Sequence, residues 1–138
     1  VVMDLYSRKL VGWTVRESLK TQGALDALKV AIGNRMPSAG MIHHSDRGVQ
    51  YASKEYQETL RKHGIRSSMS RVGDCWDNAP MESFFGRMKQ EIGVALFESK
   101  AAARQAVFKH IERFYNPRRR HSALGYLSPD DFKLMNVA

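Results

Sequence analysis

Two acidic residues stand where carboxylates could take part in chemistry. Asp46 follows a short apolar segment, residues 41–44, and precedes Gly48 by two positions. Ligands of α/β proteins gather beyond the carboxyl ends of strands, so Asp46 suits a metal ligand. Glu82 lies near the start of an expected helix, at the border of its apolar face. Taken alone, each acid could have a structural role instead of a functional one. Asp46 could form a turn or cap a helix, and Glu82 could be a glutamate in the first turn that the helix dipole stabilises.

The neighbours of Glu82 favour a site over an ordinary surface position. Lys89 is seven residues further on and lies nearly over Glu82 on a helical wheel, with Gly86 close to the same side. A carboxylate, a lysine and a glycine without a side chain could together serve a metal ion and an approaching phosphate backbone. Thirty-five residues separate Asp46 from Glu82.

Apolar periodicity predicts the elements that must position these residues. A hairpin of two antiparallel strands comes first, followed by alternating helices and strands, in the order ββαβαβαα. The expected ranges are strands 1–6 and 10–16, a helix from an N-cap at Thr21 to Ile32, a strand at 41–44, a helix through Ala52, Tyr56 and Leu60, an edge strand at 65–70, and helices 80–92 and 101–115. This order predicts an α/β sandwich with a mixed sheet.

Two helices carry more specific expectations. A Glu58–Lys62 pair at i,i+4 should support the second helix, and Gly64 should follow its C-terminus. One face of the third helix should be buried; its residues are Met81, Phe84, Phe85, Met88 and Ile92.

Composition narrows the class of protein. The 138 residues suit one domain, and no apolar run approaches the roughly 18 residues of a membrane span. The single cysteine favours a reducing, cytoplasmic location. Lys and Arg number 22 against 14 Asp and Glu, a net charge of +8. Such an excess suggests a nucleic-acid partner, the alternative being a merely soluble basic surface.

Several short motifs follow one another along the chain. They are DLYSR at 4–8, HSDRGVQY at 44–51, SMSR at 68–71, DNAPMESFF at 77–85, KQE at 89–91 and YNPRRRHSALGY at 115–126. In this order they resemble the motifs of bacterial insertion-sequence transposases of the DDE type, whose catalytic core is retroviral-integrase-like. The resemblance spans nearly the whole chain.

The resemblance implies a ribonuclease-H-like fold and metal-dependent cleavage and strand transfer of DNA. Asp46 would be the second acid and Glu82 the third acid of a site for two Mg²⁺ or Mn²⁺ ions, which suits phosphoryl transfer. The implied partners are element ends and target DNA, held by a homo-oligomer. The residues expected to contact DNA are Lys89, Arg119, His121, Asn78 and Asn116.

The first acid is the departure from the family pattern. The family places it on a strand before the one that bears Asp4, whereas Asp4 itself matches the turn of the DLYSR motif. We therefore expect residues 1–138 to form a single catalytic core domain, truncated at its N-terminus and inactive by itself, with residues 117–138 as a basic C-terminal extension.

Two other functions remain open at this stage. One is a non-catalytic module for DNA binding or assembly, and the other is a ribonuclease-H-like nuclease without transposition. A zinc site at His43 and His44 lacks a second histidine cluster at ligand spacing. His44 is instead expected to orient the loop that carries Asp46.

Overall fold

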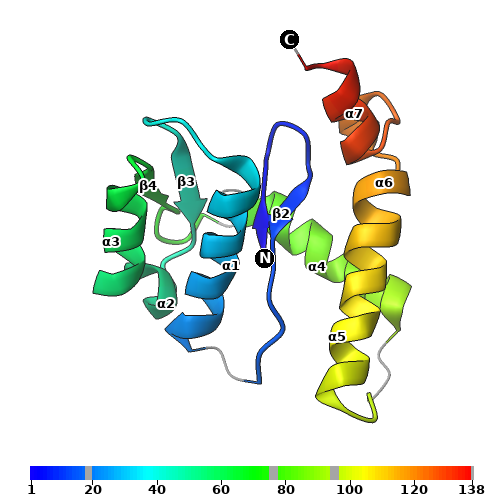
Figure 1. Ribbon diagram of the computed structural model, residues 1–138, viewed down its shortest axis with the longest axis horizontal. Coiled ribbons are helices and arrows are strands. Elements are labelled where there is room, and N and C mark those ends of the chain that lie inside the picture. The colour runs from blue at the N-terminus through cyan, green and yellow to red at the C-terminus, as the bar shows by residue number, and fades with distance from the viewer. Residues whose placement is uncertain (18–19, 75–77, 94–96, 138) are drawn as a thin grey trace. The chain divides into compact units, whose positions relative to one another are not determined.

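The computed structural model describes residues 1–17, 20–74, 78–93 and 97–137 (Figure 1). The chain divides into two compact units. The first unit comprises Val1–Val2 and Val11–Glu82, and the second comprises Met3–Leu10 and Ser83–Ala138.

The expected hairpin is present but shorter than predicted. Strand β1 (Val2–Met3) pairs with β2 (Leu10–Gly12). The turn begins at Asp4, whose carboxylate accepts hydrogen bonds from the Tyr6 N–H at 3.0 Å and the Ser7 hydroxyl at 2.9 Å. A short carboxylate that satisfies nearby donors favours a turn over an extended strand. Asp4 therefore has the turn role that its motif predicted.

Helix α1 (Thr21–Arg35) forms a large part of the first unit's core. Its N-cap is Lys20 rather than the predicted Thr21. Gly12 of β2 is buried against this helix. A Cβ atom there would lie 2.2 Å from the Ala27 carbonyl oxygen, so the close approach requires glycine. The central cluster of buried apolar side chains comprises Leu25, Leu28, Tyr56, Leu60 and Ile65.

The predicted second helix is two helices. Ser53 ends α2 (Val49–Ala52) and caps α3 (Lys54–Lys62), accepting a hydrogen bond from the Tyr56 N–H. Ala52 is consequently exposed instead of buried. Among the described ion pairs Glu58 contacts Arg61, at 3.6 Å, and not Lys62. The predicted Gly64 follows α3 with a φ of +67°, a conformation that favours glycine.

Strands β3 (Ile42–Ser45) and β4 (Arg66–Met69) form a parallel pair with Ser45 opposite Met69. Within the described residues the strands make two separate two-stranded sheets, β1–β2 and β3–β4. Parallel sheets are normally covered on both faces, yet β3 alternates between exposed and half-buried side chains. The α/β class is confirmed, whereas the described pairing does not join the four strands into one mixed sheet.

The second unit is mainly helical. It contains the end of α4 (Ala79–Ile92), α5 (Lys100–Phe108), a π-helical segment (Lys109–Tyr115), the short α6 (Asn116–Arg118), a 3₁₀ turn (Ser122–Leu124) and α7 (Pro129–Met135). The predicted helix 101–115 is therefore α-helical only in its first half. Helix α7 was not predicted.

The apolar face predicted for α4 is only partly buried. Phe84 is 3% exposed and packs edge-on against Tyr115, with ring centroids 5.1 Å apart. Phe85 is 38% exposed, and Met88 and Ile92 are half-buried. The helix buries a narrow line of side chains rather than the wide face that the wheel predicted.

Candidate active site

Asp46 lies directly after β3, at an exposed position. Its Oδ1 atom accepts a hydrogen bond from the Gly48 N–H at 2.7 Å, which folds the segment back on itself. A Cβ atom on Gly48 would lie 2.8 Å from that same oxygen and 2.8 Å from Gln50 Oε1. Glycine at position 48 therefore leaves the space that the Asp46 carboxylate occupies.

Glu82 lies in the first turn of α4 and is also exposed. Asp46 and Glu82 belong to the same compact unit. Two carboxylates at accessible positions offer the oxygen ligands that Mg²⁺ and Mn²⁺ accept, so the donor set fits a divalent ion. The described part of the chain contains no group of three or more His, Cys, Asp or Glu residues that could hold a metal ion.

The two histidines of β3 are engaged by protein partners. His43 Nε2 lies 2.9 Å from the Tyr56 hydroxyl. Burial lowers the pKa of His43 and raises that of Tyr56, so both groups are neutral and the imidazole accepts a hydrogen bond from the phenol. His44 contacts the hydroxyls of Ser68 at 3.0 Å and Ser70 at 3.2 Å. These contacts are suited to the orienting role expected of His44.

The residues predicted to contact DNA occupy very different environments. Lys89 is exposed on α4. Asn78 accepts a hydrogen bond from the Ser70 hydroxyl at 2.7 Å. Asn116 is 2% exposed, and its amide accepts from the Leu10 N–H at 2.9 Å and donates to the Leu10 carbonyl at 3.0 Å. The Asn116 side chain therefore binds the backbone of Leu10, which belongs to the same unit, and does not face solvent.

Arg119 belongs to a partly buried polar cluster of the second unit. It forms an ion pair with Glu91, and its side chain is 14% exposed. The Nε2–H of His110 donates to the other Glu91 carboxylate oxygen at 2.6 Å. Burial lowers the pKa of His110, which is consistent with a neutral ring whose Nδ1 has no described hydrogen-bond partner. Glu91 thus joins α4 to the segments that carry His110 and Arg119.

His121 stands beside this cluster and packs edge-on against Tyr115, with ring centroids 5.2 Å apart. Its pKa is lowered to about 4, first by burial and then by the charges of Arg119, Arg8 and Arg87. His121 is therefore neutral at pH 7.

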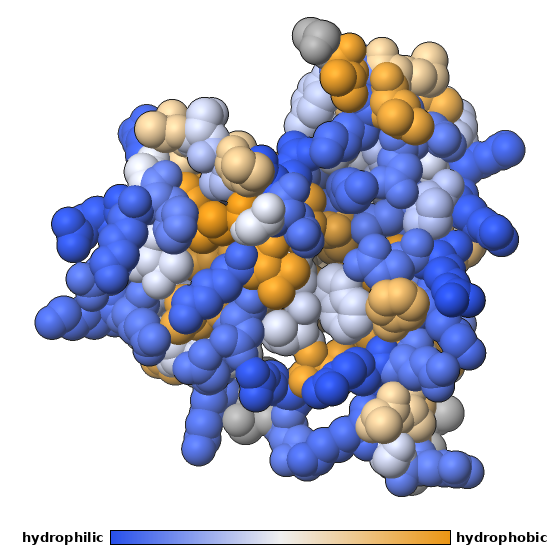
Figure 2. Space-filling view, viewed as in Figure 1, coloured by the Kyte–Doolittle hydropathy of each residue, from blue (hydrophilic) through white to orange (hydrophobic). Residues whose placement is uncertain are grey.

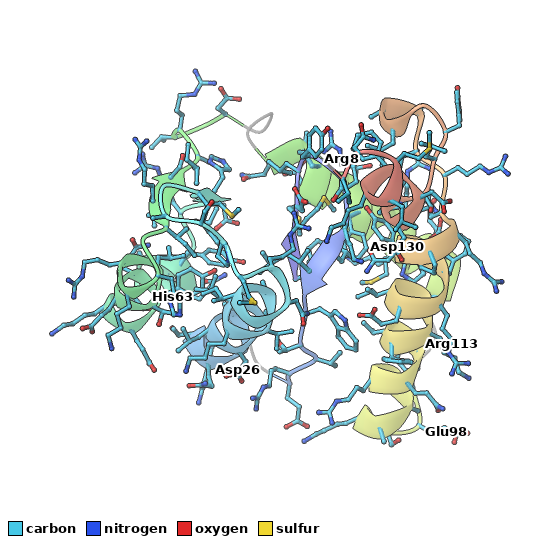
Figure 3. The ribbon with its side chains drawn as sticks, turned by 45° about the horizontal axis from the view of Figure 1, so that its top comes forward. Arg8, Asp26, His63, Glu98, Arg113 and Asp130 are labelled. Atoms are coloured by element: carbon cyan, nitrogen blue, oxygen red, sulfur yellow. The ribbon has the colours of Figure 1, made fainter. Side chains whose placement is uncertain are left out.

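Arg8 and Arg87 were not predicted as site residues, because the fold and not their spacing along the sequence places their charges where they act on His121. Arg8 lies in the hairpin turn with a φ of +59° and is labelled in Figure 3. Arg113 is labelled in the same figure and extends outward from the π-helix. Polar and charged side chains cover much of the surface in Figure 2.

The low pKa of His121 predicts acid sensitivity. The unfolded chain, with a His pKa near 6.5, binds this proton more readily than the folded chain, whose value is about 4. The contribution of His121 to the free energy of unfolding should therefore be fully present above about pH 6.5. It should be lost as the pH falls from there to about 4. His121→Asn should reduce that fall, measured by urea unfolding at pH 7.5 and 5.0.

His63→Asn, at an exposed position of α3's C-terminus, is the matched control. His43 and His110 retain their own contributions in both variants, since burial lowers their pKa values too. Equal pH dependence in His121→Asn and the unchanged chain would contradict the assignment.

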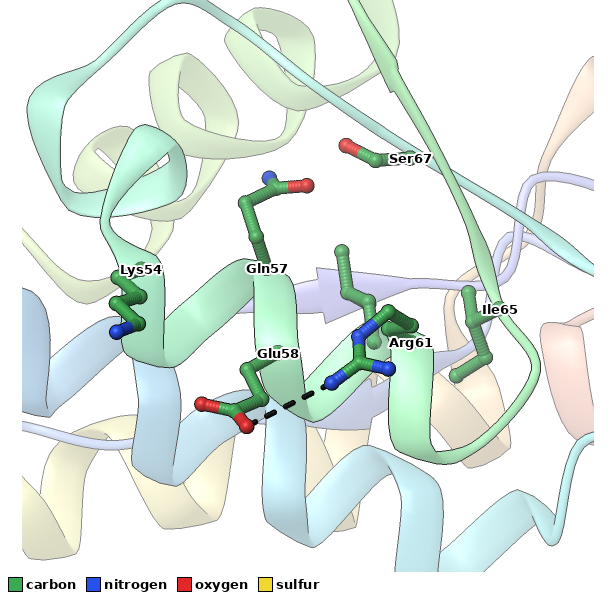
Figure 4. A pocket seen from close by; sticks show the side chains of 7 residues that line it. Lys54, Gln57, Glu58, Arg61, Ile65 and Ser67 are labelled. Atoms are coloured by element: carbon green, nitrogen blue, oxygen red, sulfur yellow. Dashed lines mark ion pairs between the residues drawn. The ribbon is translucent and has the colours of Figure 1, made fainter.

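A pocket of 460 Å³ lies between α3 and β4 (Figure 4). Its charged lining residues are Lys54, Glu58 and Arg61, and the last two form an ion pair. The mixture of charges does not select for a phosphate backbone, and neither candidate acid lines the pocket.

The fold and the motifs define a class. The integrase core domain model matches residues 1–75, and a second integrase core domain model matches residues 63–129. The chain belongs to the integrase core domain family, which confirms the resemblance drawn from its motifs.

Curated relatives are similar along the entire chain. The transposase for insertion sequence element IS904 of Lactococcus lactis subsp. lactis is 47% identical over 137 residues, covering 99% of this chain and 54% of the relative. Transposase InsF for insertion sequence IS3A of Escherichia coli K12 is 45% identical over 139 residues, covering 100% and 48%. The chain thus spans about half the length of these relatives.

A solved structure supports the fold. The cryo-electron microscopy structure of a simian T-cell lymphotropic virus intasome in complex with PP2A regulatory subunit B56 gamma contains a chain that matches with a TM-score of 0.66. The match is 18% identical and covers 91% of this chain and 43% of that chain. The ribonuclease-H-like fold expected from the motifs is confirmed. In the described residues, no helix is long and apolar enough to cross a membrane.

Proposed function

We propose that this chain is part of the catalytic core of a DNA transposase that cleaves element ends and joins them to target DNA with the help of divalent metal ions. The observation that carries the proposal is the placement of Asp46 after β3 and Glu82 in the first turn of α4, with thirty-five residues between them. Similarity to two insertion-sequence transposases over the whole chain supports it.

Each acid has a defined part in the proposed reaction. Asp46 and Glu82 would hold Mg²⁺ or Mn²⁺, and bound ions of this kind activate the attacking hydroxyl and stabilise the leaving oxygen. The Gly48 N–H holds one Asp46 oxygen in place by a hydrogen bond. The backbone of Glu82 is held by its place in the first turn of α4. Lys89 would contact the phosphate backbone. Water and a DNA 3′-hydroxyl would be the successive nucleophiles, so no covalent enzyme intermediate is required.

Binding of Mn²⁺ to the metal-free chain tests the site without requiring catalysis. Asp46→Asn and Glu82→Gln should each weaken binding about tenfold or more, because each removes a charged ligand. Electron paramagnetic resonance of free Mn²⁺ gives the affinity.

Glu55→Gln is the matched control, since Glu55 also lies in the first turn of a helix, α3. If Asp46→Asn binds Mn²⁺ as well as the unchanged chain does, Asp46 is not a ligand.

A second function, a DNA-binding or assembly module, is favoured by one observation. Among the described residues, neither candidate acid belongs to a group of three or more His, Cys, Asp or Glu side chains that could hold a metal ion. We propose on this ground that the 138-residue chain alone does not carry out strand transfer. In the proposed transposase, a homo-oligomer would hold two DNA ends together in the cytoplasm.

DNA binding by the chain should be weak, little dependent on sequence and strongly dependent on salt. Lysine–phosphate contacts release counterions, so affinity should fall steeply between about 50 and 200 mM salt. Lys89→Ala should lower the slope of log affinity against log salt by about one. Fluorescence anisotropy of a labelled duplex at several salt concentrations measures the affinity and this slope.

Lys62→Ala, at an exposed lysine of α3, is the control. Lys89 is a better probe than Arg119, whose removal also takes an ion-pair partner from Glu91. Affinity that stays constant across this salt range would refute binding through phosphate contacts.

A further inference from the structure

Ser70 connects the two segments that carry the candidate acids. It follows β4 by one residue and is 4% exposed. Its hydroxyl donates to Asn78 Oδ1 at 2.7 Å and lies 3.2 Å from His44 Nε2. Asn78 immediately precedes α4, and His44 belongs to β3. One buried hydroxyl therefore touches both the end of β3 and the start of α4.

The Ser70 hydroxyl has one hydrogen and two oxygen acceptors within reach, Asn78 Oδ1 at 2.7 Å and the Ser45 carbonyl at 3.2 Å. The shorter contact is the one to Asn78. With the hydrogen on either oxygen, the Ser70 oxygen is an acceptor for His44, whose Nε2 then carries a hydrogen and donates it. His44 Nδ1 is left as the acceptor for the Ser68 hydroxyl at 3.0 Å. The resulting chain runs from Ser68 through His44 and Ser70 to Asn78.

The backbone of Ser70 reinforces the same connection. Its N–H donates to the Ser45 carbonyl at 2.9 Å, and its carbonyl accepts from Arg47 Nε at 2.9 Å. Both residues that flank Asp46 are thus bound to Ser70. At the other end, Asn78 lies four residues, about one helical turn, before Glu82.

From this geometry we infer that Ser70 is a positioning residue, whose hydroxyl fixes the segment carrying Asp46 against the N-terminus of the helix carrying Glu82. Its effect on a metal ion rests on the proposed function, whereas its effect on the two segments does not. Outer partners that orient metal ligands typically change metal affinity by about 10-fold to 100-fold when removed.

The test compares Ser70→Ala, which loses the hydroxyl, with Ser70→Thr, which keeps it. Ser67→Ala is the matched control, since Ser67 is an exposed serine of β4 outside this chain of hydrogen bonds. In metal-free protein, amide hydrogen exchange reports the two segments. Exchange at Gly48 and in the first turn of α4 should accelerate about tenfold in Ser70→Ala, consistent with local opening, and should not change in Ser67→Ala.

Two further readouts separate positioning from a general loss of stability. Long-range ¹H–¹⁵N spectra should show His44 in the Nε2–H form in the unchanged chain and in Ser70→Thr. Mn²⁺ affinity should fall about tenfold in Ser70→Ala and recover in Ser70→Thr.

The outcomes are distinct. Unchanged exchange at Gly48 in Ser70→Ala, or a His44 ring in the Nδ1–H form, would overturn the inference. A third outcome is that exchange accelerates in Ser70→Ala while Asp46→Asn leaves Mn²⁺ affinity unchanged. That result would support the role of Ser70 in fixing the two segments and would overturn the proposed metal site.

Discussion

Strand transfer is expected to fall about a thousandfold or more when Asp46 is replaced by Asn in a chain extended to supply the proposed third acid. Each carboxylate of the proposed site would contribute several kcal/mol of metal-borne stabilisation. The extension can be the part of the Lactococcus lactis relative that this chain does not match. Asn keeps an oxygen that can accept the Gly48 N–H, so the variant changes charge more than shape. Glu82→Gln should have a comparable effect. The measurement is the rate of joining of end-containing oligonucleotides in Mg²⁺.

Glu55→Gln in the same extended chain is the control and should retain full activity. A rate above about a tenth of the unchanged value in Asp46→Asn would exclude a metal-binding role, given the expected loss. Strand transfer by the 138-residue chain without extension would contradict the proposed need for a third acid. Asp4, whose carboxylate is engaged in the hairpin turn, would then become the candidate for the first position.

Gly12→Ala is expected to lower the free energy of unfolding by about 3 kcal/mol, at the upper end of the range for overpacked cores. The new Cβ atom would lie 2.2 Å from the Ala27 carbonyl oxygen and 2.7 Å from Ala31 Cβ. The first contact is with helix backbone, which cannot turn away as a flexible side chain can. Urea unfolding followed by circular dichroism measures the change.

Gly33→Ala provides a control on the same helix. A Cβ atom there meets no atom within 4 Å, and alanine is the better helix former. Gly33→Ala should therefore stabilise the chain by about 0.5–1 kcal/mol. If both variants have similar stabilities, the close approach of β2 to α1 does not limit the fold.

Local sequence patterns were sufficient where a single element decides the outcome. The apolar spacing from Ala24 to Ile32 predicted α1, and the range expected for α4 differs from the observed one by a single residue. Gly64 has the positive φ expected after a helix. The break at Ser53 was missed because apolar periodicity continued through it, although a serine side chain can end one helix and cap the next.

The candidate acids could be predicted from the sequence, but the contacts that hold their segments in place could not. Asp46 and Glu82 stood out by residue type and spacing, and whether they share a metal ion stays a prediction. The Ser70 hydroxyl joins residues from three parts of the chain, and no one-dimensional period contains such a contact. The burial of Asn116 against Leu10 likewise depends on residues 106 positions apart.

The π-helical segment Lys109–Tyr115 holds one residue more than an α-helix of the same number of turns would. Buried residues recur at intervals of five, His110 with Tyr115 and Ile111 with Asn116, and the Asn116 N–H bonds to the Ile111 carbonyl. Deleting one exposed residue would close the segment to an α-helix and leave the residues after it facing nearly the same way, because the wide turn absorbs the change. Asn116 would then keep its place against Leu10. A deletion within the regular helix α1 would instead rotate everything after it by about 100°.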